Sequence, residues 1–142
     1  MRRIIATAAL LMALGGCATS PIQVSEARHV PASEMYAIKS QDVQDPGRLT
    51  ILRDDGFVGA GCAAVFYIDG QRAAKIGPGQ KASFILPAGE VSLGAGLAES
   101  GLCAGAAIKT VTANIKPGRE VIYRINWDTQ GFYLGPYVEN GR

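Results

Sequence analysis

The sequence from Arg53 to Asp69 is Arg-Asp-Asp-Gly-Phe-Val-Gly-Ala-Gly-Cys-Ala-Ala-Val-Phe-Tyr-Ile-Asp. It contains the turn dipeptide Asp55-Gly56, and the glycines that follow allow the backbone to bulge or to approach another strand closely. An apolar run from Val65 to Ile68 then ends at Asp69-Gly70, a dipeptide typical of tight hairpins. Because both alternating faces of this run are apolar, we predict a central strand that is buried on both sides.

Short alternating segments lie on both sides of this strand, separated by glycine and proline turns. Alternation of apolar and polar residues is typical of strands with one buried face. The pattern predicts strands over residues 49–53, 63–68, 72–76, 81–86, 90–95, 110–115, 120–126 and 132–137. Seven or eight short strands at this spacing predict one all-β domain, a small antiparallel β-sandwich over residues 48–142.

The first 16 residues have the layout of a secretory signal. Arg2-Arg3 precedes an apolar run from Ile4 to Leu14, which is about half the roughly 20 residues that a membrane-spanning helix needs. Cys17 follows Leu-Gly-Gly directly, and this arrangement resembles the bacterial lipoprotein signal. The resemblance implies that residues 1–16 are removed and that Cys17 becomes the acylated first residue, a lipid anchor in a membrane. Ala18 after the cysteine implies sorting to the outer membrane, facing the periplasm.

Residues 17–47 are polar and contain three prolines, without sustained periodicity. We interpret them as a flexible tether that lets the domain stand away from the membrane. Residues 31–39 favour one short helical turn. The only histidine, His29, lies in this tether, where we expect it to be solvated rather than a base or a metal ligand.

The charge balance argues against nucleic acid as a partner. The chain has 14 basic and 12 acidic residues, and removal of Arg2 and Arg3 with the signal leaves a net charge of zero. No basic patch or charge run remains in the mature sequence.

Two further cysteines, Cys62 and Cys103, flank the predicted central strands. An exported chain matures in an oxidising compartment, so we expect a disulfide bond between them. The alternative is two separate buried thiols. A metal or nucleophile role is disfavoured because no histidine or clustered ligand accompanies them.

Four segments carry a resemblance to a family: Arg53–Cys62, Ile68-Asp69-Gly70, Gly101-Leu102-Cys103 and Lys116-Pro117-Gly118. Together they resemble a family of uncharacterised proteobacterial envelope lipoproteins that are expected to form small β-sandwiches. The turns are also similar, more loosely, to those of PEGA-type surface modules. The family has no established activity, so the resemblance implies a fold and a compartment only.

Catalytic motifs are missing from the sequence. It contains no Gly-x-Ser-x-Gly segment, and we expect no enzyme, no cofactor and no metal site. Asp54-Asp55 is compatible with a calcium ligand pair, but a polar hairpin tip is the favoured interpretation.

The most suggestive surface contains Trp127, Asp128, Phe132 and Tyr133, since aromatic rings beside an acid can stack on sugars or anchor a partner. The favoured alternative is that Trp127 closes one end of the core. The sequence therefore predicts a lipid-anchored envelope protein with a non-catalytic binding or structural role, whose partner is an envelope protein or the cell wall. The alternative function is a modulator of an envelope hydrolase, docking through the loop Gly96–Gly105.

Overall fold

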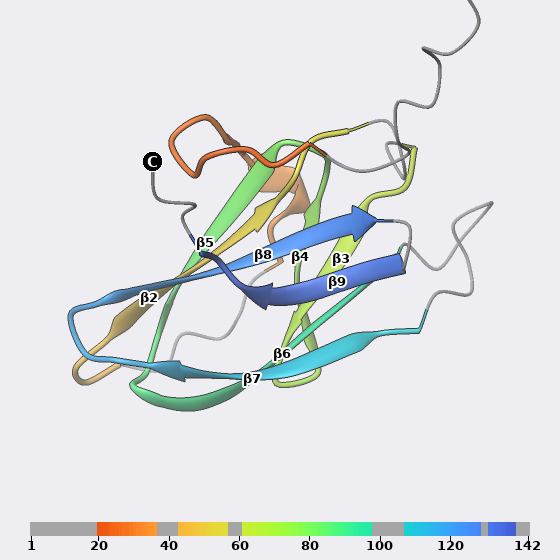
Figure 1. The fold of residues 1–142 in the computed structure, drawn as a ribbon. Helices are drawn as coiled ribbons and strands as arrows, with labels where there is room; N and C mark the ends of the chain where they lie inside the picture. Colours follow the sequence, from red (N-terminus) through yellow and green to blue (C-terminus); the bar gives the residue numbers. More distant parts are fainter. Residues whose placement is uncertain (1–19, 37–42, 57–60, 98–106, 129–130, 139–142) are drawn as a thin grey trace, which may run out of the picture.

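The computed structural model describes residues 20–36, 43–56, 61–97, 107–128 and 131–138 (Figure 1). Within these residues the chain is nearly all β, as predicted, and no helix is long and apolar enough to cross a membrane. The elements are β1 (Arg28–His29), η1 (Ala32–Glu34), β2 (Gly47–Arg53), β3 (Ala64–Ile68), β4 (Gln71–Ile76), β5 (Gln80–Leu86), β6 (Gly89–Leu97), β7 (Lys109–Ile115), β8 (Glu120–Asp128) and β9 (Gly131–Pro136).

The strands form two sheets that pack face to face as a β-sandwich. One sheet has the order β1-β5-β2-β8-β9 and the other β4-β3-β6-β7. The predicted central strand β3 lies between β4 and β6. Most pairs are antiparallel, but β2 and β8 run parallel, as do the short β1 and β5. Strands as far apart in sequence as β2 and β8 need no hairpin between them, so this parallel pair was not visible in the turn pattern.

The hairpin between β3 and β4 confirms the prediction from Asp69-Gly70. Both residues have a positive φ, 47° and 76°, as the favoured two-residue hairpin turns require. The inward faces of the two sheets build one core, in which the rings of Phe66 and Phe84 lie 5.9 Å apart. Other core residues that exclude solvent completely include Leu49, Ile51, Ile76 and Leu93.

Residues 20–36 do not form the flexible tether expected from the sequence. They make a strap that crosses the outer face of the five-stranded sheet and then bridges to the other sheet. Ser20 pairs with Asp55, β1 pairs with β5, and Met35 pairs with Ala74 of β4. Two of its own residues, Ala27 and Val30, are buried against the sandwich. We call residues 20–36 the N-terminal strap; its helical turn is the 3₁₀ segment η1, and His29 is exposed in β1.

The strand registers define two ends of the sandwich. At the first, which we call the Trp127 end, β2 and β8 finish side by side, and Ser20 and Gly79 join them through hydrogen bonds to the backbone after β2. At the second, the Ala88 end, lie the start of β2, paired with Leu86, and the turn that joins β5 to β6. Figure 1 shows β8 running between these two ends.

Candidate functional site

A cavity of about 560 Å³ opens towards the Ala88 end, beside β5 and below the strap. Ligand sites in proteins have volumes of roughly 300–1,000 Å³, so this one is large enough for a side-chain cluster or a small molecule. Most of its walls are apolar. The lining residues are Met35, Tyr36, Val43, Ile68, Asp69, Gln71, Ser83, Phe84, Ile85, Leu86, Pro87, Ala88, Glu90 and Val91. The chain between Tyr36 and Val43 lies outside the described residues.

The cavity lies at the edge of β5. Among the described residues, the strap pairs with β5 only at Gln80 and Lys81, so no described strand continues alongside residues 83–86. Side chains from both faces of this segment line the cavity, Phe84 and Leu86 from the core face and Ser83 and Ile85 from the outer face. The cavity therefore wraps around a strand edge.

The backbone of β5 adds hydrogen-bonding groups to this apolar wall. Val30 donates to the carbonyl oxygen of Lys81 at 2.9 Å, which shows that the Lys81 backbone groups point away from β2. Because backbone groups alternate along a strand, those of Ser83 and Ile85 point to the same side. An apolar cavity beside an edge with this geometry can hold an extended peptide.

Two polar groups of the cavity take part in hydrogen bonds within the sandwich. Asp69 accepts a hydrogen bond from the backbone of Ser92 at 2.9 Å, and Ser83 bonds to the hydroxyl of Thr50 at 2.8 Å. Within the described part of the chain, no group of three His, Cys, Asp or Glu residues is placed to hold a metal ion. The arrangement can bind a ligand and orient it.

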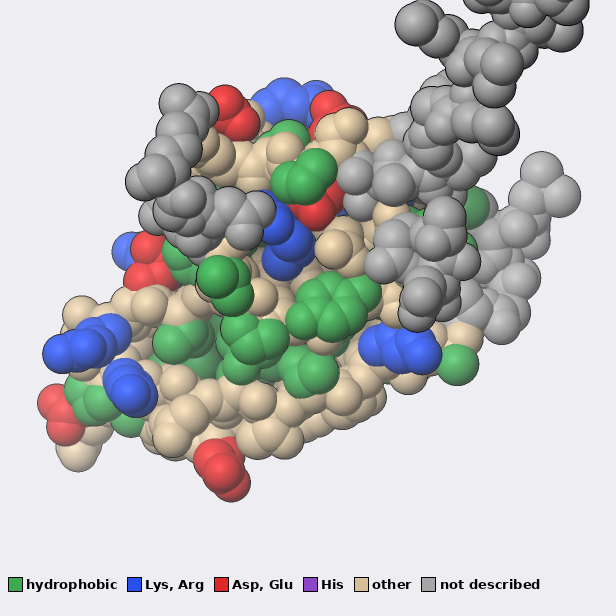
Figure 2. Space-filling model, viewed as in Figure 1, with side chains coloured by type: hydrophobic (Ala, Val, Ile, Leu, Met, Phe, Trp, Pro, Cys, Tyr) green, Lys and Arg blue, Asp and Glu red, His purple; other side chains and the backbone are tan. Residues whose placement is uncertain are grey.

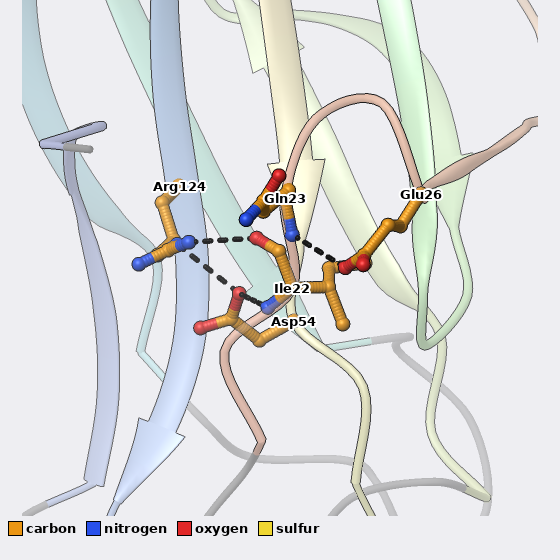
Figure 3. Close-up of polar contacts among 5 residues, drawn as sticks. All are labelled: Ile22, Gln23, Glu26, Asp54 and Arg124. Atoms are coloured by element: carbon orange, nitrogen blue, oxygen red, sulfur yellow. Dashed lines mark hydrogen bonds and ion pairs between the residues drawn. The ribbon is translucent and has the colours of Figure 1, made fainter. Parts of the chain in front are cut away.

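A second polar cluster lies on the outer face of the five-stranded sheet, near the Trp127 end (Figure 3). Arg124 Nε lies 3.1 Å from Asp54 Oδ1, and Arg124 Nη2 donates to the carbonyl oxygen of Ile22 at 2.9 Å. The backbone of Ile22 in turn donates to Asp54 Oδ1 at 3.4 Å. The Asp54 side chain is 1% exposed, and the guanidinium of Arg124 also lies 4.6 Å from the ring centre of Tyr137.

Burial raises the pKa of Asp54, while the charge of Arg124 and the hydrogen bond from Ile22 act in the opposite direction. Asp54 is therefore a buried partner of Arg124 and not the tip of a polar hairpin, which corrects the expectation from the sequence. The pair binds the backbone of the strap to β8 and to the residue that follows β2. Burial also lowers the pKa of the neighbouring Arg53 to about 10; Arg53 Nη1 donates to the carbonyl oxygen of Ile76 across the sandwich at 2.8 Å.

Some of the aromatic residues that were predicted to form a surface pack against the core instead. Trp127 is half-buried and packs edge-to-face on Phe132 with ring centres 5.8 Å apart, and Phe132 contacts the core cluster. Tyr133, on the other face of β9, is 49% exposed. Asp128 pairs with Gly131, and its side chain lies outside the described residues. Figure 2 shows hydrophobic side chains gathered in the middle of the side of the molecule that is in view, over β7, β8 and β9.

The cysteines are only partly described. Cys62 takes part in a disulfide bond. Cys17 and Cys103 lie outside the described residues, so the pairing of Cys62 with Cys103 and the lipidation of Cys17 remain predictions.

Sequence reasoning missed the cavity and the Asp54–Arg124 pair. One signal for the cavity was present: Ile85 is apolar at a position where the alternation of β5 calls for a polar residue, and it is 50% exposed. The ion pair joins residues 70 positions apart, and no local pattern marks it.

Comparison of the chain with protein-family models, with curated proteins and with solved structures found no match.

Proposed function

We propose that this chain is a lipid-anchored envelope protein on the periplasmic side of the outer membrane, and that its sandwich domain binds a partner protein without catalysis. The observation that carries the binding role is the cavity beside residues 83–86 of β5, a segment whose outer edge pairs with no strand among the described residues. The position of Cys17 directly after an apolar run and Leu-Gly-Gly supports the anchor.

The partner that fits this site is an extended segment of an envelope protein. Such a segment adds a strand to the sheet, taking its hydrogen bonds from the backbone of Ser83 and Ile85. Its alternate side chains enter the cavity against Phe84, Leu86 and Val91, where apolar contact stabilises the complex. Main-chain pairing gives affinity, and the cavity gives specificity.

The anchor is tested by the intact mass of the protein purified from membranes, with half of the culture treated with globomycin. We expect a chain that starts at Cys17 and carries acyl groups, and accumulation of the unprocessed form in treated cells. A mass that retains residues 1–16 and no acyl group would contradict the proposal.

The binding role is tested by photo-crosslinking in cells with a benzoylphenylalanine placed at residue 85. Ile108 is the matched control, since the two isoleucines are 50% and 53% exposed and Ile108 packs beside Gly94 and Gly96 instead of the cavity. We expect a specific adduct from position 85 that position 108 does not give. A proline at position 85 removes one outward N–H and should abolish partner binding. Equal adducts from both positions would argue against the site.

A further inference from the structure

The N-terminal strap is fixed to the domain from its first described residue. The backbone of Ser20 donates to the carbonyl oxygen of Asp55 at 2.6 Å. Two residues later, Arg124 and Asp54 hold the backbone of Ile22, and Lys81 Nζ donates to the carbonyl oxygen of Val24 at 2.6 Å. Each of these contacts lies on the outer face of the five-stranded sheet or at its Trp127 end. From Ser20 onward the backbone of the strap is therefore held against the sandwich.

Only three peptide units separate Cys17 from Ser20 in the sequence. A fully extended chain spans at most about 3.6 Å per residue, so the two Cα atoms are at most about 11 Å apart. The headgroup region on each side of a bilayer is about 5–8 Å thick. A lipid chain attached at Cys17 thus brings the Trp127 end to the membrane surface, in contrast to the long stand-off expected for a tether of about 30 residues.

The side chains at this end suit a membrane interface. Trp127 and Phe132 are half-buried and lie opposite each other where β8 ends and β9 begins. Trp and Tyr concentrate at the level of the lipid headgroups, because their rings are apolar and carry one polar group. The cations Arg28 and Lys109 and the acid Asp55 are exposed near the same end, so the charge is mixed and contact needs no anionic lipid.

We infer that the Trp127 end of the sandwich rests on the lipid headgroups, with Trp127 and Phe132 nearest the bilayer and the Ala88 end pointing away from it. This orientation rests on the lipid anchor of the proposed function. β8 spans about 25–30 Å between the ends, at about 3.3 Å per residue. The cavity beside β5 then faces the aqueous compartment, where a partner can reach it.

Trp127 is the only tryptophan in the chain, so its fluorescence tests the orientation directly. The full-length protein, purified from membranes, is placed in phosphatidylcholine vesicles whose acyl chains carry bromine near the headgroup or near the bilayer centre. We expect a loss of Trp127 fluorescence with the shallow bromine and a smaller loss with the deep one. The matched control is the double variant Trp127→Phe/Ala88→Trp, which moves the probe to the exposed turn at the far end and should show no loss.

A second variant keeps Trp127 and tests the role of the short connection. A flexible Gly-Ser insertion of about 12 residues between Thr19 and Ser20 adds a root-mean-square span of about 19 Å. This variant should retain the acyl groups and lose most of the quenching.

The intact mass of each sample separates the two proposals. An acylated chain whose Trp127 is not quenched, or is quenched equally in the insertion variant, overturns the orientation and leaves the anchor standing. Strong quenching at position 88 with weak quenching at 127 also overturns the orientation alone. So does a bound protein, instead of lipid, that shields Trp127. A mass without acyl groups overturns the anchor and the orientation together.

Discussion

The two ends of the sandwich are built from different interactions. At the Trp127 end, Lys81 of β5, Arg124 of β8 and Asp54, which follows β2, hold the backbone of the strap, and a buried ion pair joins Asp54 to Arg124. At the Ala88 end, apolar side chains surround a cavity and the edge of β5. Directional contacts fix the strap in one geometry, whereas the apolar cavity offers space for side chains of a bound segment. The first end is suited to holding a fixed attachment and the second to binding.

The largest effect should come from breaking the ion pair at the Trp127 end. Arg124→Met leaves the carboxylate of Asp54 buried without its counter-charge and should lower the free energy of unfolding by about 3–5 kcal/mol at neutral pH. Urea unfolding measures this loss. Arg119→Met is the control, because Arg119 is exposed in the turn before β8 and should be nearly neutral.

The loss in Arg124→Met should depend on pH. Burial already raises the pKa of Asp54, and removing the arginine raises it further. A raised folded pKa means that the folded state binds the proton more tightly than the unfolded chain, so stability from this group is present at low pH and is lost as the pH rises through the folded pKa. The variant should therefore recover stability relative to the native protein in mild acid. A loss that is independent of pH contradicts a buried carboxylate at this position.

The disulfide bond of Cys62 should contribute about 2–4 kcal/mol, mainly by restricting the unfolded chain. If Cys103 is its partner, Cys62→Ser, Cys103→Ser and the double variant should lose similar free energies of unfolding under non-reducing conditions. Cys103→Ser with native stability would refute that pairing.

Leucine-to-alanine substitutions at two positions compare the stability contributed by the packed core with that contributed by the wall of the cavity. Leu49 is fully buried in the core, whereas Leu86 lines the cavity. Leu→Ala at a core site costs about 2–5 kcal/mol and costs most where a new cavity is created, so Leu49→Ala should be more destabilising than Leu86→Ala by about 1–2 kcal/mol. Equal losses in thermal or urea unfolding would mean that the cavity is effectively filled.

The smallest loss of stability should come from removing one side-chain contact to the strap. Lys81→Met removes the hydrogen bond to Val24 and should cost about 1 kcal/mol, because the ammonium is only half-buried. Limited proteolysis should cut the strap faster in this variant while the sheet stays intact. Lys116→Met, at an exposed position in the turn after β7, is the control, and an equal cutting rate in both variants would show that Lys81 does not hold the strap.

Most of the fold follows from local sequence. Alternation placed the eight strands of the domain within a few residues, and Asp69-Gly70 predicted its hairpin because both residues tolerate a positive φ. The strap could not be predicted, since its backbone is held by side chains that lie far away in sequence: Arg124 is 102 residues from Ile22 and Lys81 is 57 from Val24. Its polar composition resembles that of a flexible linker, and only tertiary contacts distinguish the two.

The candidate site was visible only in part. Trp127 and Phe132 were predicted to lie together, and they do, but their half-buried contact comes from the pairing of β8 with β9. The cavity depends on where the strap leaves the edge of β5, which no local pattern encodes.

Hydrogen–deuterium exchange tests most directly whether the two ends have different roles. The lipidated protein on phosphatidylcholine vesicles is compared with the Cys17→Ser domain in solution. The membrane should slow exchange around Asp55, Trp127 and Phe132 and leave residues 83–91 unchanged. Slowed exchange at residues 83–91, or no difference at the Trp127 end, would contradict the assignment of one end to the membrane and the other to a partner.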